Sequence, residues 1–311
     1  MSRITPDKTT GHYDRSAIAT QRVLRWSNNS PPAHAIYLIG DSTLYEGLNL
    51  ALLNEVVARF LPSTEIVDLL TSAQSILDAI LLIDNLPASS SGIVVVGHSV
   101  RKLNIIDRQL SRSKNRSTFG LSSFTLNQFL LNLGVKPRKQ YGLFSIDTFW
   151  FAAPRILRHY KKRFSSAFSA NRKMDIKPQT QDLSKMEELY LIDVIKPYDA
   201  YRKKLYQGRA ALLEIQQLVN RNPNLELAVL ETPLNPSLID GKLGNDFYDE
   251  YIDDFKTFSK ENNIVYLVPQ YLDALVPSDF ADLLHLSNNN AIDSYTRDVA
   301  KLLIDQQNDR K

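Results

Sequence analysis

The stretch Ile36-Tyr-Leu-Ile-Gly-Asp-Ser42 decides the fold that we predict from this sequence. Its apolar run at 35–39 is unbroken, which suits a parallel β-strand buried on both faces, and the run ends in a polar turn. Further apolar runs predict strands at 65–70, 93–96, 225–230 and 264–268, and helical spacing of apolar residues recurs at 48–61, 75–86 and 292–303. Strands that alternate with helices predict an α/β fold, a flavodoxin-like doubly wound parallel sheet with helices on both faces. In such sheets ligands bind beyond the carboxyl ends of the strands, where Ser42 and Ser99 are both expected to lie.

Composition excludes several kinds of chemistry. The chain has 311 residues, 43% of them hydrophobic, and a formal net charge of +3. It contains no cysteine, which excludes thiol catalysis, disulfide bonds and cysteine-ligated zinc. The five histidines are scattered and no glycine-rich phosphate loop occurs, so we expect neither a metal nor a nucleotide cofactor. The mild charge gives no reason to expect a nucleic-acid partner.

The domain organisation follows from shifts in composition. Residues 1–34 are polar and end in a Pro-Pro pair, so we expect an N-terminal arm before one α/β domain at 35–311. A basic helical insertion is expected at about 104–200, between the third and fourth strands. No stretch approaches the roughly 20 apolar residues of a membrane span. The start of the chain also lacks the apolar core of a secretory signal, so we expect a cytoplasmic location.

The insertion has two interpretations. Its basic clusters at 136–139 and 158–163 stand among or beside aromatic residues. They form either a solvated helical cap or a peripheral contact with an anionic membrane through 136–164, because basic and aromatic residues together suit a membrane surface. Binding of another polyanion, such as a nucleic acid, through the basic insertion stays open as a further alternative.

A second motif, Phe280-Ala-Asp-Leu-Leu-His285, places an aspartate three residues before a histidine near the other end of the chain. With Ser42 it supplies the three roles of a hydrolytic triad: Ser42 is the nucleophile, His285 its base and Asp282 the carboxylate that orients the imidazole. Asp279 is an alternative acid. The motif lies between the last predicted strand and the last predicted helix. If the three residues act as a triad, Ser42 and His285 should meet at the carboxyl edge of the sheet, with the hydroxyl within about 4 Å of a ring nitrogen.

The turn that carries Ser42 also has two interpretations. A serine at the start of a helix can offer its own N–H to an oxyanion, while Asp41 ties down the turn through its side chain. Alternatively, Asp41 and Ser42 only cap the helix that follows, and His285 is an ordinary loop histidine.

The Gly40-Asp-Ser42 turn and the Asp-x-x-His spacing at 282–285 together resemble the SGNH (GDSL-type) hydrolase superfamily. In that superfamily the serine attacks an ester, and the Asp-x-x-His motif supplies the histidine base and the aspartate that orients it. The resemblance implies two oxyanion blocks, one with a glycine after the second strand and one reading Gly-x-Asn-Asp after the third. Here Ala73 stands near the first glycine position, and Ser99 of Gly97-His-Ser-Val100 replaces the asparagine. The implied oxyanion and substrate-binding residues are Ser42, Ala73, Gly97 and Ser99.

Within the superfamily, the chain is most similar to DltD-like and related SGNH-like proteins of bacterial envelope-polysaccharide systems. The similarity rests on Gly40-Asp-Ser42, Val229-Leu-Glu-Thr-Pro-Leu-Asn-Pro236 and Phe280-x-Asp-x-x-His-Leu286, and it covers about 35–100 and 190–305. It implies a serine esterase or O-acyltransferase whose substrate is a small acyl ester, with an ester carried on a carbohydrate as one candidate.

Two other functional interpretations stay open. The segment Val94-Val-Val-Gly-His-Ser99-Val-Arg101 resembles most of the Gly-x-Ser-x-Gly elbow of α/β-hydrolases, with Ser99 as nucleophile. Arg101 at the second glycine position argues against that assignment, as does an acid only three residues before His285. The substituted oxyanion blocks favour instead a catalytically silent protein that keeps the fold for binding or assembly. His98 is either a substrate-binding residue or a structural one.

Overall fold

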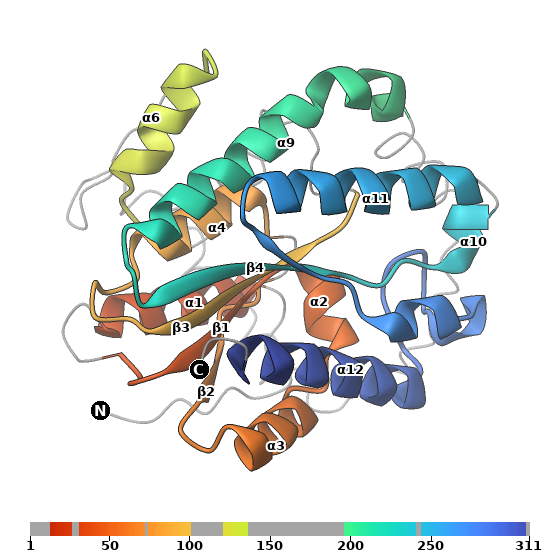
Figure 1. Cartoon of the computed structure of the whole chain (residues 1–311), viewed down its shortest axis with the longest axis horizontal. Coiled ribbons are helices and arrows are strands. Elements are labelled where there is room, and N and C mark those ends of the chain that lie inside the picture. Colours follow the sequence, from red (N-terminus) through yellow and green to blue (C-terminus); the bar gives the residue numbers. More distant parts are fainter. Residues whose placement is uncertain are drawn as a thin grey trace, which may run out of the picture.

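A computed structural model of the chain describes residues 13–26, 31–71, 74–100, 121–135, 196–240 and 244–308. Its centre is a five-stranded, all-parallel sheet in the order β2-β1-β3-β4-β5 (Figure 1). The strands are β1 (Ala35–Ile39), β2 (Glu65–Asp68), β3 (Gly92–His98), β4 (Leu225–Glu231) and β5 (Val265–Leu267). The α/β class and the parallel sheet predicted from the sequence are confirmed, and each predicted strand overlaps an observed one.

Strand β1 shows how the sheet is buried on both faces. Its side chains alternate, so that Ala35, Tyr37 and Ile39 pack into the apolar cluster on one face. Ile36 and Leu38 pack into the cluster on the other face. All five side chains are fully buried, as expected of a parallel strand with helices on both sides.

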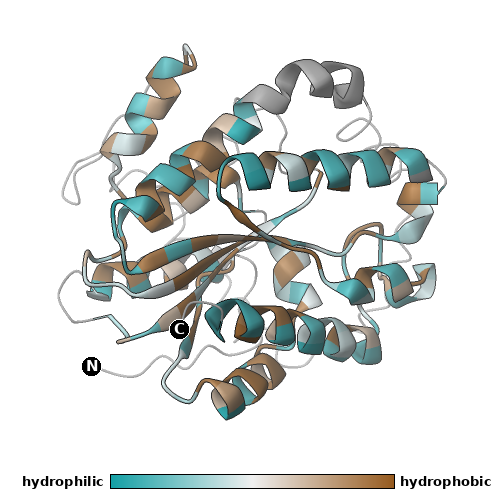
Figure 2. Cartoon of the chain, viewed as in Figure 1, coloured by the Kyte–Doolittle hydropathy of each residue, from teal (hydrophilic) through white to brown (hydrophobic). Residues whose placement is uncertain are grey.

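Helices cover the two faces unequally (Figure 1). The cluster on one face includes residues of α1 (Tyr13–Trp26), α4 (Ile76–Asp84), α6 (Phe124–Asn132), α9 (Lys196–Asn220) and α11 (Asn245–Glu261). The cluster on the other face includes residues of α2 (Ser42–Gly47), α3 (Leu50–Phe60) and α12 (Asn289–Asn308). The strands between the layers are mostly hydrophobic, whereas the helices mix hydrophobic with hydrophilic residues (Figure 2).

The segment expected to be an N-terminal arm, 1–34, contributes a helix to the domain. Ala19 and Val23 of α1 are buried in the same apolar cluster as the sheet. Trp26 at the end of α1 meets the ring of Tyr37 edge-on, with the two ring centroids 6.0 Å apart. The arm interpretation is therefore corrected for residues 13–26. The helix was hidden because, of its apolar side chains that the structure describes, only Ala19 and Val23 are buried, and two in a mostly polar segment are too few to show a helical period.

The helix predicted at 48–61 is confirmed as α3, which begins two residues later than predicted. The separate short helix α2 precedes it, and Leu48 is in an extended conformation between the two. Asn49 causes the break, because its side chain caps α3 by accepting a hydrogen bond from the first turn. Asn49 also donates to Asp293 through its amide group and to Thr296 through its backbone N–H, both on α12. The break thereby fixes the end of α2 to α12.

Only part of the insertion predicted at 104–200 falls among the described residues. Helix α6 lies there, and the hydroxyl of Ser123 that caps it also donates to Asp84 of α4 at 2.6 Å. The basic clusters and the membrane contact predicted for 136–164 lie outside the described residues. Among the helices that the structure describes, none has both the length and the apolar character needed to cross a membrane.

Leu44 is packed between the carboxyl ends of β1 and β3. A Cβ atom on Gly40 would lie 2.9 Å from Leu44 Cδ2, and a Cβ atom on Gly97 would lie 2.7 Å from it. Glycine at both positions leaves the space that this fully buried side chain fills. Because Leu44 follows Ser42 by two residues in α2, its packing sets where Ser42 stands on the sheet.

We expect Gly97→Ala to destabilise the protein by about 1–3 kcal/mol, because the added methyl group must displace the buried side chain of Leu44. Gly47→Ala is the matched control, since its Cβ atom would meet no atom closer than Pro233 Cγ at 3.7 Å. The control should change stability by no more than about 0.5 kcal/mol. Urea unfolding followed by circular dichroism measures both variants. Equal stabilities would contradict the tight packing of Leu44.

Candidate functional site

Ser42 begins α2 directly beyond the carboxyl end of β1. Asp41 caps this helix, because its Oδ1 accepts hydrogen bonds from the N–H of Thr43 at 3.1 Å and from the Thr43 hydroxyl at 2.5 Å. Asp41 is thus the structural residue that the sequence predicts, and the capping role belongs to it and not to Ser42. Ser42 stands at the first helical position, where the N–H has no acceptor within the helix.

His285 lies on a loop between β5 and α12 that is held together by its own backbone. An isolated antiparallel bridge joins the two sides of this loop, and the Ala281 N–H donates to the His285 carbonyl at 2.9 Å. Oδ1 of Asp282 accepts the N–H groups of Leu284 and His285 at 2.7 and 2.9 Å. Asp282 therefore stands in a fixed relation to His285.

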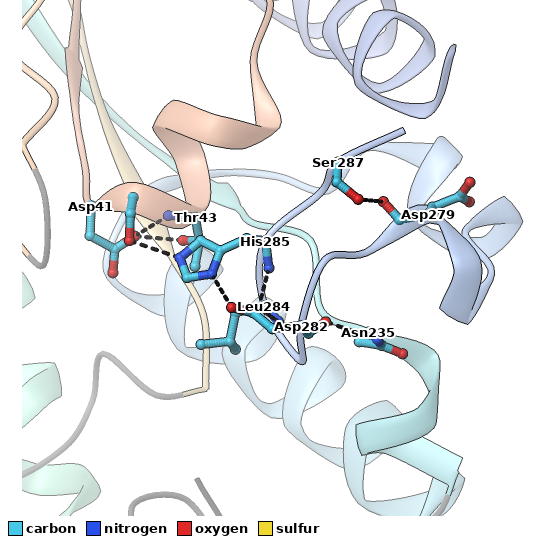
Figure 3. A network of polar contacts seen from close by, with 9 residues as sticks. Asp41, Thr43, Asn235, Asp279, Asp282, Leu284, His285 and Ser287 are labelled. Atoms are coloured by element: carbon cyan, nitrogen blue, oxygen red, sulfur yellow. Dashed lines mark hydrogen bonds and ion pairs between the residues drawn. The ribbon is translucent and has the colours of Figure 1, made fainter. Parts of the chain in front are cut away.

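The structure brings the three predicted triad residues together. Ser42 Oγ lies 2.9 Å from His285 Nε2, and Nδ1 of the same ring lies 2.7 Å from Asp282 Oδ2. Because a carboxylate only accepts hydrogen bonds, Nδ1 carries the ring proton and Nε2 is left as the acceptor for the Ser42 hydroxyl. Figure 3 shows the ring of His285 between the Asp41–Thr43 turn and the loop of Asp282. The geometry is that of a nucleophile, a base and an orienting acid, and the catalytic role stays a prediction.

The surroundings of His285 raise the pKa of its ring. Burial alone would lower that pKa, because it disfavours the charged imidazolium. The hydrogen bond and negative charge of Asp282, with smaller contributions from Glu46 and Asp41, outweigh burial. Burial would raise the pKa of the Asp282 carboxyl, but hydrogen bonds from His285 and Leu284 lower it overall. The pair therefore favours a proton on His285 once one has been accepted, as a general base requires.

Asp279, the alternative acid, has a different task. One of its carboxylate oxygens accepts the side-chain amide of Asn288 at 2.7 Å, and the other accepts the Val276 N–H at 3.0 Å. Its carbonyl accepts two further backbone N–H groups from the far side of the loop. Asp279 therefore closes the base of the loop, whereas Asp282 is the acid that contacts His285.

The other residues predicted for the site are Ala73, Gly97 and Ser99. Ala73 lies outside the described residues. Gly97 is part of β3, where its missing side chain makes room for Leu44. Ser99 follows β3 and is 3% exposed. The hydroxyl that contacts His285 Nε2 is that of Ser42, so His285 is paired with Ser42 and not with Ser99.

A buried polar cluster lies at the carboxyl ends of β3 and β4, and the sequence did not reveal it. The hydroxyls of Tyr251 and Tyr266 donate to Glu231 Oε2 at 3.1 and 2.8 Å, and the hydroxyl of Tyr295 donates to the Glu231 carbonyl at 2.9 Å. Burial and then the Glu231 charge raise the pKa of Tyr266. The ring of His98 is 1% exposed and stacks on a phenylalanine of α11, with ring centroids 4.4 Å apart. These contacts support the structural interpretation of His98.

Asn235 is the residue next to the site that sequence reasoning missed. Its Nδ2 donates to the Asp282 carbonyl at 3.0 Å, and its backbone N–H donates to the Leu283 carbonyl at 3.2 Å. The Asn-Pro pair after a buried strand does predict a helix cap, and Asn235 is one, since its Oδ1 accepts the Ser237 N–H. A cap gives no local signal for a contact with a loop 47 residues further along the chain.

Over the ranges that the structure describes, no group of three or more histidine or acidic side chains is placed to hold a metal ion. Comparison of the chain with protein-family models and with curated proteins finds no match. Function is therefore inferred from the geometry and chemistry of the site itself.

We expect Asp282→Asn to lower the pKa of His285. The substitution removes the main contribution that raises this pKa, while the burial that lowers it stays. Imidazole chemical shifts followed against pH by NMR, and assigned with His285→Gln, measure the change. Asp279→Asn is the control, because this carboxylate lies in the same loop and bonds to Asn288 and Val276. An unchanged pKa in Asp282→Asn, or an equal fall in the control, would contradict the assigned pair.

Proposed function

We propose that this protein is a serine esterase or O-acyltransferase that works through Ser42, His285 and Asp282. The observation that carries the proposal is the pair of short contacts on one imidazole, 2.9 Å from Nε2 to Ser42 Oγ and 2.7 Å from Nδ1 to Asp282. A loop histidine that met a serine by chance would not need an acid on its opposite nitrogen. The site also lies at the carboxyl edge of a parallel sheet, where ligands of such folds bind.

In the acylation step, Nε2 of His285 accepts the hydroxyl proton while Ser42 Oγ bonds to the carbonyl carbon of the ester. The carbonyl oxygen becomes an oxyanion. The Ser42 N–H at the start of α2 is its first donor, with Ala73, Gly97 and Ser99 as further predicted contributors. When the tetrahedral intermediate collapses, the bond to the leaving alcohol breaks, and the alcohol oxygen takes the proton from His285.

In the second step, the acyl group is carried as an ester on Ser42. His285 takes a proton from water or from an acceptor hydroxyl, whose oxygen attacks the acyl carbon, and then returns the proton to Ser42 Oγ as the acyl group leaves. Water yields a carboxylic acid and an acceptor hydroxyl yields a new ester, so hydrolysis and transfer use the same groups. Both steps start from neutral His285.

Because the pKa of His285 is raised, the acid limb of the pH profile of kcat/KM should lie above the ordinary histidine value of about 6.5.

The topology supports a flavodoxin-like sheet of the SGNH type as the setting of this chemistry. The strand order is 2-1-3-4-5, with the serine turn after the first strand and the Asp-x-x-His loop between the last strand and the last helix. The resemblance to that superfamily points to a small O-acyl ester as substrate, with an ester carried on a carbohydrate as a candidate.

The alternative function is that of a catalytically silent SGNH-fold protein for binding or assembly. Chemical labelling of the serine separates the enzyme from the silent protein.

A fluorophosphonate probe should label the protein at Ser42. Ser42→Ala should abolish the labelling and lower p-nitrophenyl acetate turnover at least about 10³-fold, because the nucleophile is lost, while the melting temperature stays nearly the same. Ser99→Ala is the control and should keep measurable turnover, because it removes at most one oxyanion donor. A folded protein that takes no label would support the silent alternative. An active Ser42→Ala with an inactive Ser99→Ala would support the α/β-hydrolase assignment.

A further inference from the structure

The two halves of the proposed site come from strands that are not neighbours. Ser42 follows β1, whereas Asp282 and His285 follow β5, which lies three strands away in the order β1-β3-β4-β5. At about 4.8 Å between neighbouring strands, this separation amounts to about 14 Å in the sheet. The loop must therefore reach back across the ends of β4 and β3 before His285 can meet Ser42.

Contacts within the loop do not set this reach. The bonds from Asp282 to the N–H groups of Leu284 and His285, and to the imidazole, fix the acid relative to the base. The contacts of Asp279 close the base of the loop. Both sets of bonds would move with the loop as one unit. The distance from this unit to Ser42 is set by what the loop contacts outside itself: the apolar cluster that buries Leu283 and Leu284, and a polar contact with the segment that follows β4.

Asn235 makes that contact from the end of β4. Its Nδ2 donates to the carbonyl of Asp282 at 3.0 Å, and its N–H donates to the carbonyl of Leu283 at 3.2 Å (Figure 3 draws Asn235 beside Asp282). Its Oδ1 accepts the Ser237 N–H at 2.9 Å as the cap of α10 (Pro236–Leu238), which fixes the orientation of the amide. Asn235 is 7% exposed, so little water competes for these bonds.

We propose that Asn235 is a positioning residue that sets the distance between His285 and Ser42, acting through the backbone of Asp282 and Leu283 without touching the substrate. The inference rests on the proposed function, because this distance matters for activity only when Ser42 is the nucleophile. A displacement of about 1 Å at a reacting centre can cost about 100-fold in rate. Loss of the amide bond should therefore lower kcat, while the contact between Asp282 and His285 stays intact.

Asn235→Ser isolates the bond to the loop. The serine hydroxyl can still accept the Ser237 N–H as a helix cap, but it is too short to reach the Asp282 carbonyl. We expect kcat for p-nitrophenyl acetate to fall about 10- to 100-fold with KM changed less than about threefold. The pKa of His285, followed by NMR, should stay near that of the unchanged protein, in contrast to Asp282→Asn. Backbone hydrogen exchange at 280–286, measured by mass spectrometry, should become faster.

Asn222→Ser is the matched control at the opposite end of β4. Asn222 has the same pattern of bonds, since its Oδ1 accepts the Asn224 N–H at 3.0 Å and its Nδ2 donates to the carbonyls of Ala88 and Ser90 at 3.1 and 2.8 Å. It stands before β4, at the end of the sheet away from Ser42. The control should lose comparable stability yet keep kcat within about twofold, because it is distant from the site.

The outcomes separate the positioning role from the proposed function. Equal kcat values in Asn235→Ser and Asn222→Ser would overturn the positioning role, and so would unchanged exchange at 280–286. If Asn235→Ser lowers kcat but also melts far below Asn222→Ser, the loss of activity would reflect general destabilisation, and the positioning role would be overturned too. If the unchanged protein neither takes the probe nor turns over the ester, the proposed function fails. Hydrogen exchange then still decides whether Asn235 holds the loop.

Discussion

Each central strand of this sheet must pair its backbone polar groups while both of its faces are covered, and this requirement decides where polar chemistry can lie. Strand β3 pairs with β1 on one side and β4 on the other, and all of its residues are buried. An unpaired polar side chain there would lose water and gain nothing. Polar groups therefore lie at the ends of the strands, and those at the carboxyl ends include Ser42 after β1, Asn235 after β4 and His285 after β5. His98 and Glu231, the buried polar exceptions, are the last residues of their strands.

Helix α12 contacts or continues into the segments that carry these separate polar groups. Asn49, at the junction that ends α2, bonds to two side chains of α12. Tyr295 of the same helix donates to the carbonyl of Glu231 at the end of β4. The loop with the Asp-x-x-His motif runs directly into α12. The turn that carries Ser42 and the loop that carries His285 thus share one support, although their strands are not adjacent.

Local patterns explain which of these features the sequence could predict. A strand covered on both faces leaves an unbroken apolar run, as at 35–39, and the serine turn and Asp-x-x-His spacing are short enough to read directly. The buried residues of α1, Ala19 and Val23, stand in a polar segment, and α11 is likewise rich in aspartate. Helix α2 was missed because its six residues are too few to show a helical period of apolar side chains. Asn235 was missed because its contact depends on tertiary structure alone.

Ser42 and His285 are 243 residues apart in the chain, and this separation has a consequence during synthesis. A ribosome that adds about 5–20 residues per second makes His285 roughly 12 to 50 s after Ser42. On the proposed mechanism, the emerging Ser42 hydroxyl is an ordinary alcohol throughout that interval, because the imidazole that removes its proton does not yet exist. Incomplete chains that end before the loop would therefore carry the serine without esterase activity. The activated serine would therefore form only after the last strand had joined the sheet.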